Sequence, residues 1–479
     1  MAEETSGVVI PAGTDGRRST TALGRAVVAG ALRPVDPAGA DAAGAEPAWR
    51  TNYPAHFRRL VEAGLPSAAD WLRIAGSGLD AAYGQLRVVL PGGAEAPLSA
   101  ALTAPAGREL RTDEVRGTGE PERELVLPWR GERLRGDGIR RQVEAWIAAG
   151  VAEPSLAGPV EAVLAHPEWL RLEGTTVAAL GAAAEMAPLA PLLRWGATVA
   201  AVDLSRPALW ERLRRTARDG AGRLLIPVAG GPDRPAQCGA DLLTEVPAVA
   251  DWLAGLPGRL LLGNYAYADG SLHLRVSAAA DVLARRLQRD RDDVALAFLA
   301  TPTDVFAVPP EAVAAATAGY ERRSRIRTAP LRTVSRGRLY QPPYGTGPGV
   351  NDSLIPQQGP NYALAKRLQR WRAAVARDAG TTVSFHVAPS TRTRSVVSNR
   401  ALRAAFDGAH HYGVEVFEPD TASTLLAALL VHDLNTAPVT AGHPWQDEAR
   451  TAVHGGLWRT PYAPRSVLPI AAVRGLVHV

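Results

Sequence analysis

Tyr362 and Lys366 lie four positions apart in the segment Asn-Tyr-Ala-Leu-Ala-Lys, near the beginning of a helix predicted over residues 360–377. Residues four apart face the same side of a helix. A phenol, with a pKa of about 10, transfers protons poorly at neutral pH, and a neighbouring cation stabilises its phenolate form. The pair therefore predicts proton transfer at a substrate oxygen. The alternative is an amphipathic helix with an exposed lysine.

Lys366 is the only lysine among the 53 lysine and arginine residues of the chain. Arginine fills every other cationic position. An ammonium is a compact point charge that shifts its pKa readily on burial, whereas a guanidinium is a planar fork that stays charged. The position of this lysine therefore favours a chemical role that arginine does not fill.

Alternating strands and helices from residue 175 onward must position this pair. The sequence predicts strands at 176–180, 198–202, 223–228, 259–263, 294–299 and 383–387, with helices at 186–195, 360–377 and 422–430. Such alternation is typical of a doubly wound, Rossmann-like α/β fold with a parallel sheet. A helix at 310–323 belongs to an irregular insert over residues 305–350, which we expect to form a lid or a substrate wall.

The first predicted strand ends at Gly181 and the second ends at Asp203. A glycine turn at the N-terminus of a helix can hold a pyrophosphate, and an acidic residue after the second strand can hold a ribose. Asp203 favours NAD, whereas Arg206 could pair with the 2′-phosphate of NADP. Ala183, Glu185 and Ala187 stand where further glycines are typical, so a structural βαβ unit is an alternative. An S-adenosylmethionine-dependent methyltransferase is another, since its carboxylate also binds a ribose.

Three segments in this order resemble the short-chain dehydrogenase/reductase family. Tyr362 and Lys366 match the family's Tyr-x-x-x-Lys motif, and the segment from Val383 to Thr393 is similar to its Val-Asn-x-Val-x-Pro-Gly segment and the threonine that follows. The run Leu-Leu-Leu-Gly-Asn-Tyr-Ala at 260–266 resembles the family's fourth strand and its Asn-Asn-Ala-Gly turn. The resemblance covers residues 170–435, and we expect a Rossmann-like domain over 169–440.

The resemblance implies an NAD(P)-dependent oxidoreductase that transfers a hydride between nicotinamide and the carbonyl or alcohol carbon of a small molecule. It implies that Tyr362 exchanges a proton with the substrate oxygen and that Lys366 lowers the pKa of Tyr362 and binds the nicotinamide ribose. The residues that it implies for cofactor binding are Gly181, Asp203, Arg206, Asn264, Lys366, Pro389, Thr391 and Thr393.

The sequence departs from the family at its catalytic serine, because Gly349 stands at the expected spacing before Tyr362. Ser353, Thr301 and Thr303 are the candidate replacements for that hydroxyl. The family's helix asparagine has no evident counterpart between Asn264 and Asn351. A non-catalytic nucleotide-binding relative is therefore an alternative function.

The rest of the chain predicts three further regions. Residues 1–48 are rich in Gly, Ala, Thr and Pro and predict a flexible lead-in. Residues 49–168 predict an accessory α+β region of unassigned role, and residues 441–479 a C-terminal tail.

Composition and charge set the expected surroundings. One cysteine, Cys238, permits no internal disulfide, and the N-terminus lacks a secretion signal, so we expect a cytoplasmic protein. No apolar run reaches the length of a membrane span, and no histidine pair has the spacing of a metal site. The net charge is +5, but the arginines are scattered among acids, which argues against nucleic-acid binding. The family resemblance allows a homo-oligomer through the tyrosine-bearing helix.

Overall fold

A mixed sheet of eight strands lies at the centre of the computed structural model, which describes residues 6–13, 15–90, 92–231, 234–323, 325–345, 349–439 and 441–477. Remaining positions of the predicted lead-in, insert and tail lie outside the described residues. Six strands are parallel, in the spatial order β9 (Arg223–Gly231), β8 (Thr198–Val202), β7 (Thr175–Leu180), β11 (Arg259–Asn264), β12 (Val294–Ala300) and β15 (Val383–Val387). In chain order this is 3-2-1-4-5-6, which confirms the predicted Rossmann-like fold.

Each of the six predicted parallel strands is present within about a residue or two at its start, and β9 extends three residues further than predicted. Two antiparallel strands that were not predicted, β4 (Arg111–Arg116) and β10 (Arg234–Cys238), pair with β9. Since β4 belongs to the region 49–168, that region contributes directly to the central sheet instead of standing apart from it.

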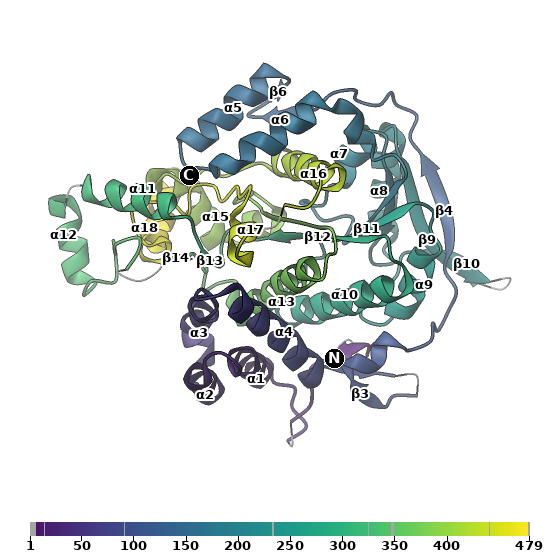
Figure 1. Cartoon of the computed structure of the whole chain (residues 1–479), viewed down its shortest axis with the longest axis horizontal. Coiled ribbons are helices and arrows are strands. Elements are labelled where there is room, and N and C mark those ends of the chain that lie inside the picture. Colours follow the sequence, from purple (N-terminus) through teal and green to yellow (C-terminus); the bar gives the residue numbers. More distant parts are fainter. Residues whose placement is uncertain are drawn as a thin grey trace.

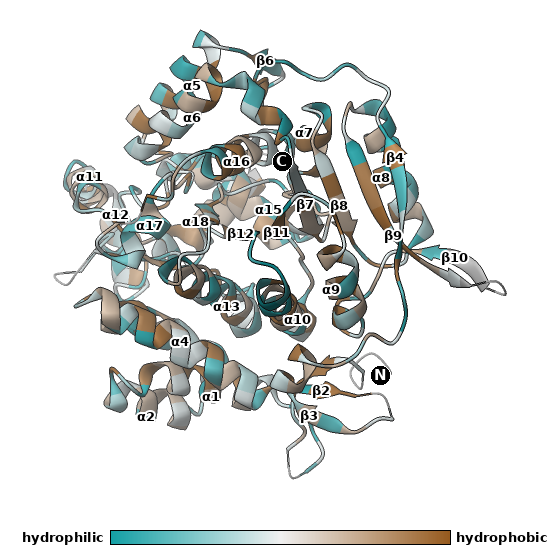
Figure 2. Cartoon of the chain, turned by 45° about the vertical axis from the view of Figure 1, so that its right-hand side comes forward, coloured by the Kyte–Doolittle hydropathy of each residue, from teal (hydrophilic) through white to brown (hydrophobic). Residues whose placement is uncertain are grey.

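Side chains alternate between the two faces of the sheet, as the two-residue period of a strand requires. Ala178, Leu180 and Leu262 join the apolar cluster on one face, whereas Val177 and Ala179 join the cluster on the other. The strands are accordingly hydrophobic along their length, while polar residues colour the outer surfaces of the helices (Figure 2). Two separate apolar cores result, one on each side of the sheet.

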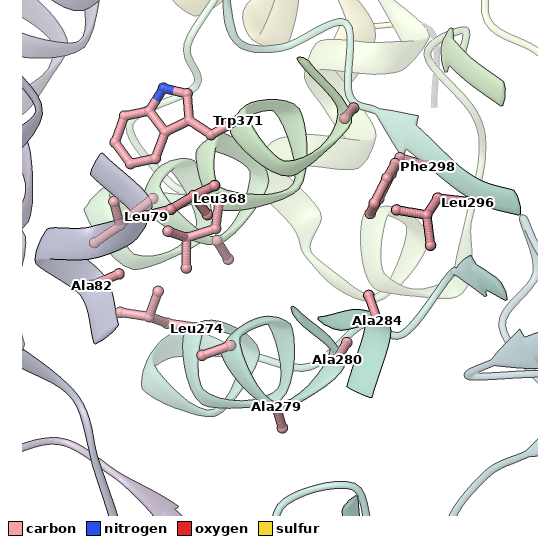
Figure 3. Close-up of a cluster of buried hydrophobic side chains, with 14 of the residues drawn as sticks. Leu79, Ala82, Leu274, Ala279, Ala280, Ala284, Leu296, Phe298, Leu368 and Trp371 are labelled. Carbon is pink, nitrogen blue, oxygen red and sulfur yellow. The ribbon is translucent and has the colours of Figure 1, made fainter. Parts of the chain in front are cut away.

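The first face is covered by α9 (Val246–Ala254), α10 (Gly270–Asp290) and α13 (Gly359–Asp378), and the helices of the N-terminal region pack beneath them (Figure 1). These are α1 (Thr20–Leu32), α2 (Pro37–Ala45), α3 (Trp49–Gly64) and α4 (Ala68–Gln85). Leu79 and Ala82 of α4 meet Leu274 of α10 and Trp371 of α13 in one buried cluster (Figure 3). α10, which was not predicted, is the longest helix among the described residues.

The described part of residues 1–48 is folded, which differs from the flexible lead-in predicted there. Residues Val8–Val9 form β1, α1 buries Val27, Val28 and Leu32, and α2 buries two of its alanines in the same core. Ser19 caps α1 by accepting a hydrogen bond from the amide of Ala22. The small side chains that suggested flexibility instead allow close helix packing.

The second face of the sheet is covered by α5 (Asp137–Ala148), α6 (Ala157–Ala165), α7 (Leu189–Arg194), α8 (Pro207–Asp219) and α16 (Pro419–Asn435). α7 is shorter than predicted and begins eight residues after Gly181. The region 49–168 is therefore divided between the two faces, with α3 and α4 on one and α5 and α6 on the other.

The insert begins and ends on a two-stranded ribbon of β13 (Val305–Ala307) and β14 (Val350–Asp352), with α11 (Pro310–Glu321) and α12 (Arg325–Val334) between them. The remaining elements are β2 (Arg87–Val89), β3 (Glu95–Pro97), β5 (Leu127–Trp129), β6 (Glu132–Leu134), α14 (Arg394–Ser398), α15 (Arg400–Asp407), α17 (Pro444–Ala449) and α18 (Pro464–Val477). None of the helices within the described ranges combines the length and the apolar character needed to cross a bilayer.

Candidate active site

Several of the predicted site residues meet at the carboxyl edge of the sheet. Asn264 is the last residue of β11, Thr301 follows β12, and Pro389 follows β15. α13 packs along β12 and brings Tyr362 and Lys366 to the same edge. Ligands of open α/β sheets bind outside the carboxyl ends of the strands, so these residues occupy the expected place.

The ring of Tyr362 stacks on His273 of α10, with ring centroids 5.2 Å apart and planes inclined by 21°, and it lies 6.2 Å from the ring of Tyr267. Burial raises the pKa of the Tyr362 phenol above its ordinary value, and the nearby hydroxyl of Thr301 offsets only part of this. Of the three candidate hydroxyls, Thr301 is the one that influences the pKa of the phenol.

Lys366 is half-buried and lies one turn further along α13 than Tyr362. Its Nζ donates to the carbonyl of Leu299, at 3.1 Å, and to Oε1 of Gln369, at 3.3 Å. Burial lowers the pKa of Lys366 to about 8, despite the opposing charge of Asp304. Lys366 was predicted to lower the pKa of Tyr362, but burial, which raises this pKa, has the largest effect, and the groups that also influence it are Thr301, Tyr267 and Asp304.

His273 is a site residue that the sequence prediction missed. It is fully buried, and neither of its ring nitrogens has a hydrogen-bond partner. Burial and the charge of Lys366 lower its pKa to about 3, so the ring is neutral at physiological pH. Its position nine residues after Asn264 could have been recognised only if α10 had been predicted, because α10 turns His273 toward Tyr362.

Buried ion pairs fix the loop of Thr301 against α13. Asp304 accepts hydrogen bonds from Arg367, at 3.2 Å, and Arg370, at 2.7 Å, and Arg370 also pairs with Glu448 at 2.5 Å. Burial alone would raise the pKa of Asp304, but the two guanidinium groups outweigh it and hold the pKa below its usual value. Because Asp304 follows Thr303 and Arg367 follows Lys366, this network fixes Thr301 relative to Tyr362.

Thr303 and Ser353, the other two candidate hydroxyls, line an apolar cavity instead of contacting the phenol. Thr303 hydrogen-bonds Thr301 at 2.7 Å and donates to Gln358 at 2.9 Å, and Ser353 donates to Asn351. The cavity has a volume of about 70 Å³, and its other walls are mostly apolar side chains of α15, α18 and the segments around them, such as Phe406, Tyr412, Val414, Leu457, Leu468 and Ala471. Thr303 therefore connects this cavity by a hydrogen bond to Thr301, whose hydroxyl influences the pKa of Tyr362.

The turn after β7 does not match a phosphate-binding turn. Gly181 has a positive φ of 73°, but a Cβ there would lie 2.6 Å from the Cα of Ala266, so this chain's own backbone occupies the space. Amides of the turn are already bonded within the chain, namely those of residues 181, 182, 183, 184 and 187. These amides are not free to bind a diphosphate as the turn stands.

Asp203 accepts hydrogen bonds from the amides of Ala183, at 2.9 Å, and Leu204, at 2.8 Å. Burial raises the pKa of Asp203, and the nearby charges of Arg212 and Arg206 oppose this. Arg206 is exposed beside it, so the end of β8 carries the carboxylate and the guanidinium that were predicted to distinguish NAD from NADP.

The residues at this edge fit the nicotinamide end of a nicotinamide cofactor, whereas the turn after β7 does not fit its diphosphate. Oδ1 of Asn264 is buried with no partner, as are both ring nitrogens of His273. Buried polar groups without partners are rare, and a bound ligand is one explanation for them. Lys366 adds a cation to the same place.

In the loop after β15, the threonine hydroxyls that were predicted to bind the cofactor form hydrogen bonds within the loop. Thr391 is buried, donates to the carbonyl of Pro389 at 2.9 Å, and forms a bridge with Phe417. Thr393 is the residue before α14, and its hydroxyl forms a hydrogen bond with that of Ser395 at 3.0 Å. The amide of Arg394 donates to Glu185 in the turn after β7, at 2.7 Å. This loop therefore reaches from the end of β15 to the turn after β7.

No protein-family model and no curated protein matches the chain. A solved thiolation-reductase di-domain from an archaeal non-ribosomal peptide synthetase is similar over 50% of this chain and 48% of that chain, at 12% identity and a TM-score of 0.30. The chain therefore spans less than half of that protein's length. A likeness this distant gives no information on activity.

Proposed function

We propose that the protein is a nicotinamide-dependent oxidoreductase acting on the carbonyl or alcohol group of a small molecule with an apolar body. The observation that carries this proposal is the placement of the Tyr362 phenol near the Thr301 hydroxyl at the carboxyl edge of the sheet, with Lys366 one turn further along α13. The apolar lining of the cavity at Thr303 supports the class of substrate, since small-molecule sites are lined mostly by apolar side chains with a few polar groups.

In this function Tyr362 exchanges a proton with the substrate oxygen. Thr301 orients that oxygen and the phenol through its hydroxyl. Lys366, mostly protonated at pH 7 with a pKa of about 8, stabilises negative charge that develops on the phenol or the substrate. His273 remains neutral beneath the Tyr362 ring and helps to exclude water. The nicotinamide, when bound, donates or accepts the hydride at the substrate carbon.

Asn264 and Lys366 would hold the nicotinamide end of the cofactor, and Asp203 with Arg206 would hold the adenosine end. The engaged amides of the turn after β7 give the diphosphate little help, so we expect weaker cofactor binding than a glycine-rich turn provides. The cofactor is NAD or NADP, according to whether Asp203 or Arg206 contacts the ribose.

The test compares Tyr362→Phe with wild type for oxidation of NADH and NADPH in the presence of apolar ketones and aldehydes. Removal of the phenolic oxygen should lower kcat by about a hundredfold or more. Tyr53→Phe is the matched control, because Tyr53 is a buried tyrosine whose hydroxyl has no partner. Equal rates for the two variants would remove Tyr362 from the mechanism.

A non-catalytic nucleotide-binding protein is the second candidate, favoured by the engaged amides around Gly181. It predicts that a reduced cofactor binds without turnover of any carbonyl compound in the panel. Turnover that depends on Tyr362 would exclude it.

A further inference from the structure

The insert between β12 and α13 carries a strongly basic arm, residues 322–338, which contains α12. The arm has arginines at positions 322, 323, 325, 327, 332, 336 and 338 and no aspartate or glutamate. α11 and α12 extend away from the sheet at the left of Figure 1. The arm therefore presents a concentrated positive charge at the periphery of the molecule.

Apolar side chains on the same arm face solvent. Ile326 is 86% exposed and Val334 is 83% exposed, and with Pro330 they occupy positions i, i+4 and i+8 of α12, which lie on one helix face. Leu331 beside them is 43% exposed. Exposed apolar residues grouped on one face indicate an interaction site, whereas isolated ones need no explanation.

The exposed arginines of the arm also lack acidic partners. Arg322, Arg323, Arg336 and Arg338 are exposed, and within the described part of the chain no ion pair includes any of them. Elsewhere many exposed arginines pair with carboxylates, for example Arg140 with Glu161. Among the described residues, the charges of these four arginines are therefore not compensated by ion pairs.

We propose that the arm docks on the surface of an anionic lipid bilayer. A helix with an apolar face flanked by arginines inserts that face among the headgroups, and each arginine gains from the negative surface potential. A nucleic acid would use the arginines but not the exposed Ile326 and Val334. A second copy of the chain would bring two positively charged arms together, which electrostatic repulsion opposes. The absence of a membrane-spanning run does not test surface attachment.

Side-chain contacts hold the base of the arm against the rest of the protein, so docking of the arm would orient the protein on such a surface. Arg332 donates to the hydroxyl of Tyr320 in α11 at 3.0 Å. Tyr340, directly after the arm, packs against Tyr412 and Tyr462. Tyr412 also lines the apolar cavity, so docking would bring a lipophilic substrate near it. That last consequence rests on the proposed function, whereas docking itself does not.

The test is co-sedimentation of the full chain with vesicles of phosphatidylcholine alone and of equimolar phosphatidylcholine and phosphatidylglycerol. The anionic vesicles should bind about tenfold more tightly or better, and high salt should weaken that binding. Ile326→Glu combined with Val334→Glu should abolish it, and Gln at positions 322, 323, 336 and 338 should remove the preference for anionic lipid. Both variants should keep the wild-type melting temperature.

Matched controls are Val439→Glu, which alters a side chain 60% exposed elsewhere, and Arg141→Gln combined with Arg215→Gln on α5 and α8. These variants should bind vesicles as wild type does. Vesicle binding that the arm variants leave unchanged would overturn the proposal. So would binding of a single-stranded oligonucleotide but of neither vesicle, or self-association through the arm without vesicle binding. Cofactor binding is measured separately and does not affect this outcome.

Discussion

Tyr362 and Lys366 interact with different neighbours along α13. The Thr301 hydroxyl lies near the phenol and influences its pKa, whereas the ammonium donates to the carbonyl of Leu299 and to Gln369. Burial raises the pKa of Tyr362 and lowers that of Lys366, so each group shifts toward its neutral form. The site therefore holds two weakly solvated groups whose protons a bound substrate could redistribute.

The lowered pKa of Lys366 predicts a pH-dependent stability. Between about pH 8, its pKa in the folded protein, and 10.5, its ordinary value, the unfolded chain keeps a proton that the folded protein has released. Stability therefore rises with pH across this window, by up to about 3 kcal/mol relative to Lys366→Met. Urea unfolding of both proteins at pH 7 and pH 10 measures the change. A stability difference that is the same at both values would mean that Lys366 is solvated.

At the scale of single residues, the sequence predicted which residues belong to the candidate site better than it predicted their contacts. The spacing of Tyr362 and Lys366 was sufficient to place them on one helix face, and Thr301 was among the candidate hydroxyls. His273 was missed because a histidine carries no sign of its partner until the helix that contains it is known. The chemistry of a residue follows from its type, but its pKa follows from burial, which only the fold determines.

Among the elements, α13 is held against the loop after β12 by Asp304, Arg367 and Arg370. Removing one partner of a buried ion pair leaves an uncompensated charge, so Asp304→Asn should lower the free energy of unfolding by about 3–5 kcal/mol. The lowered pKa of Asp304 means that its contribution is full above its unfolded pKa of about 4 and is lost as pH falls through the folded value. Denaturant unfolding at pH 7 and pH 3 measures both effects.

Glu161→Gln is the control for that comparison, since it removes an exposed carboxylate that pairs with Arg140. We expect little change in stability from it, because exposed ion pairs are screened by water. A loss from Asp304→Asn no larger than that from Glu161→Gln would contradict the account of the network.

α4 packs against α13 through a glycine. A Cβ at Gly78 would lie 2.4 Å from the indole of Trp371, whereas one at Gly76, in the same helix, would meet nothing within 4 Å. Gly78→Ala should therefore destabilise the protein by about 1–3 kcal/mol through overpacking. Gly76→Ala should stabilise it by about 0.5–1 kcal/mol, since alanine loses less entropy in a helix. Thermal unfolding of the pair measures both, and equal effects would contradict the close contact between the helices.

Element prediction from sequence was accurate for the six parallel strands, because buried strands of a parallel sheet are continuous apolar runs. It failed for α1, α2 and α10. In residues 20–45 the few large apolar side chains, such as Val27, Val28 and Leu32, are outnumbered by alanine and glycine, and their burial depends on packing partners far along the chain. The contact of Gly78 with Trp371 likewise joins residues that lie far apart along the chain.

At the scale of the whole molecule, the N-terminal helices and the Rossmann-like sheet share one apolar core. Tyr83 of α4 donates to Asp281 of α10, at 2.8 Å, and Arg372 of α13 pairs with the same carboxylate at 2.6 Å. These contacts join segments separated by almost 300 residues, which a local pattern cannot predict. The N-terminal helices α1 to α4 therefore support the helices that carry Tyr362 and His273.

The account as a whole depends on a nicotinamide cofactor at the carboxyl edge of the sheet. Calorimetric titration of wild type and Lys366→Met with NADH and with NADPH tests this most directly, with circular dichroism to verify folding. We predict that wild type binds one of the two stoichiometrically and that Lys366→Met binds it about tenfold more weakly. Folded wild type that binds neither cofactor, or binding that Lys366→Met leaves unchanged, would contradict the account.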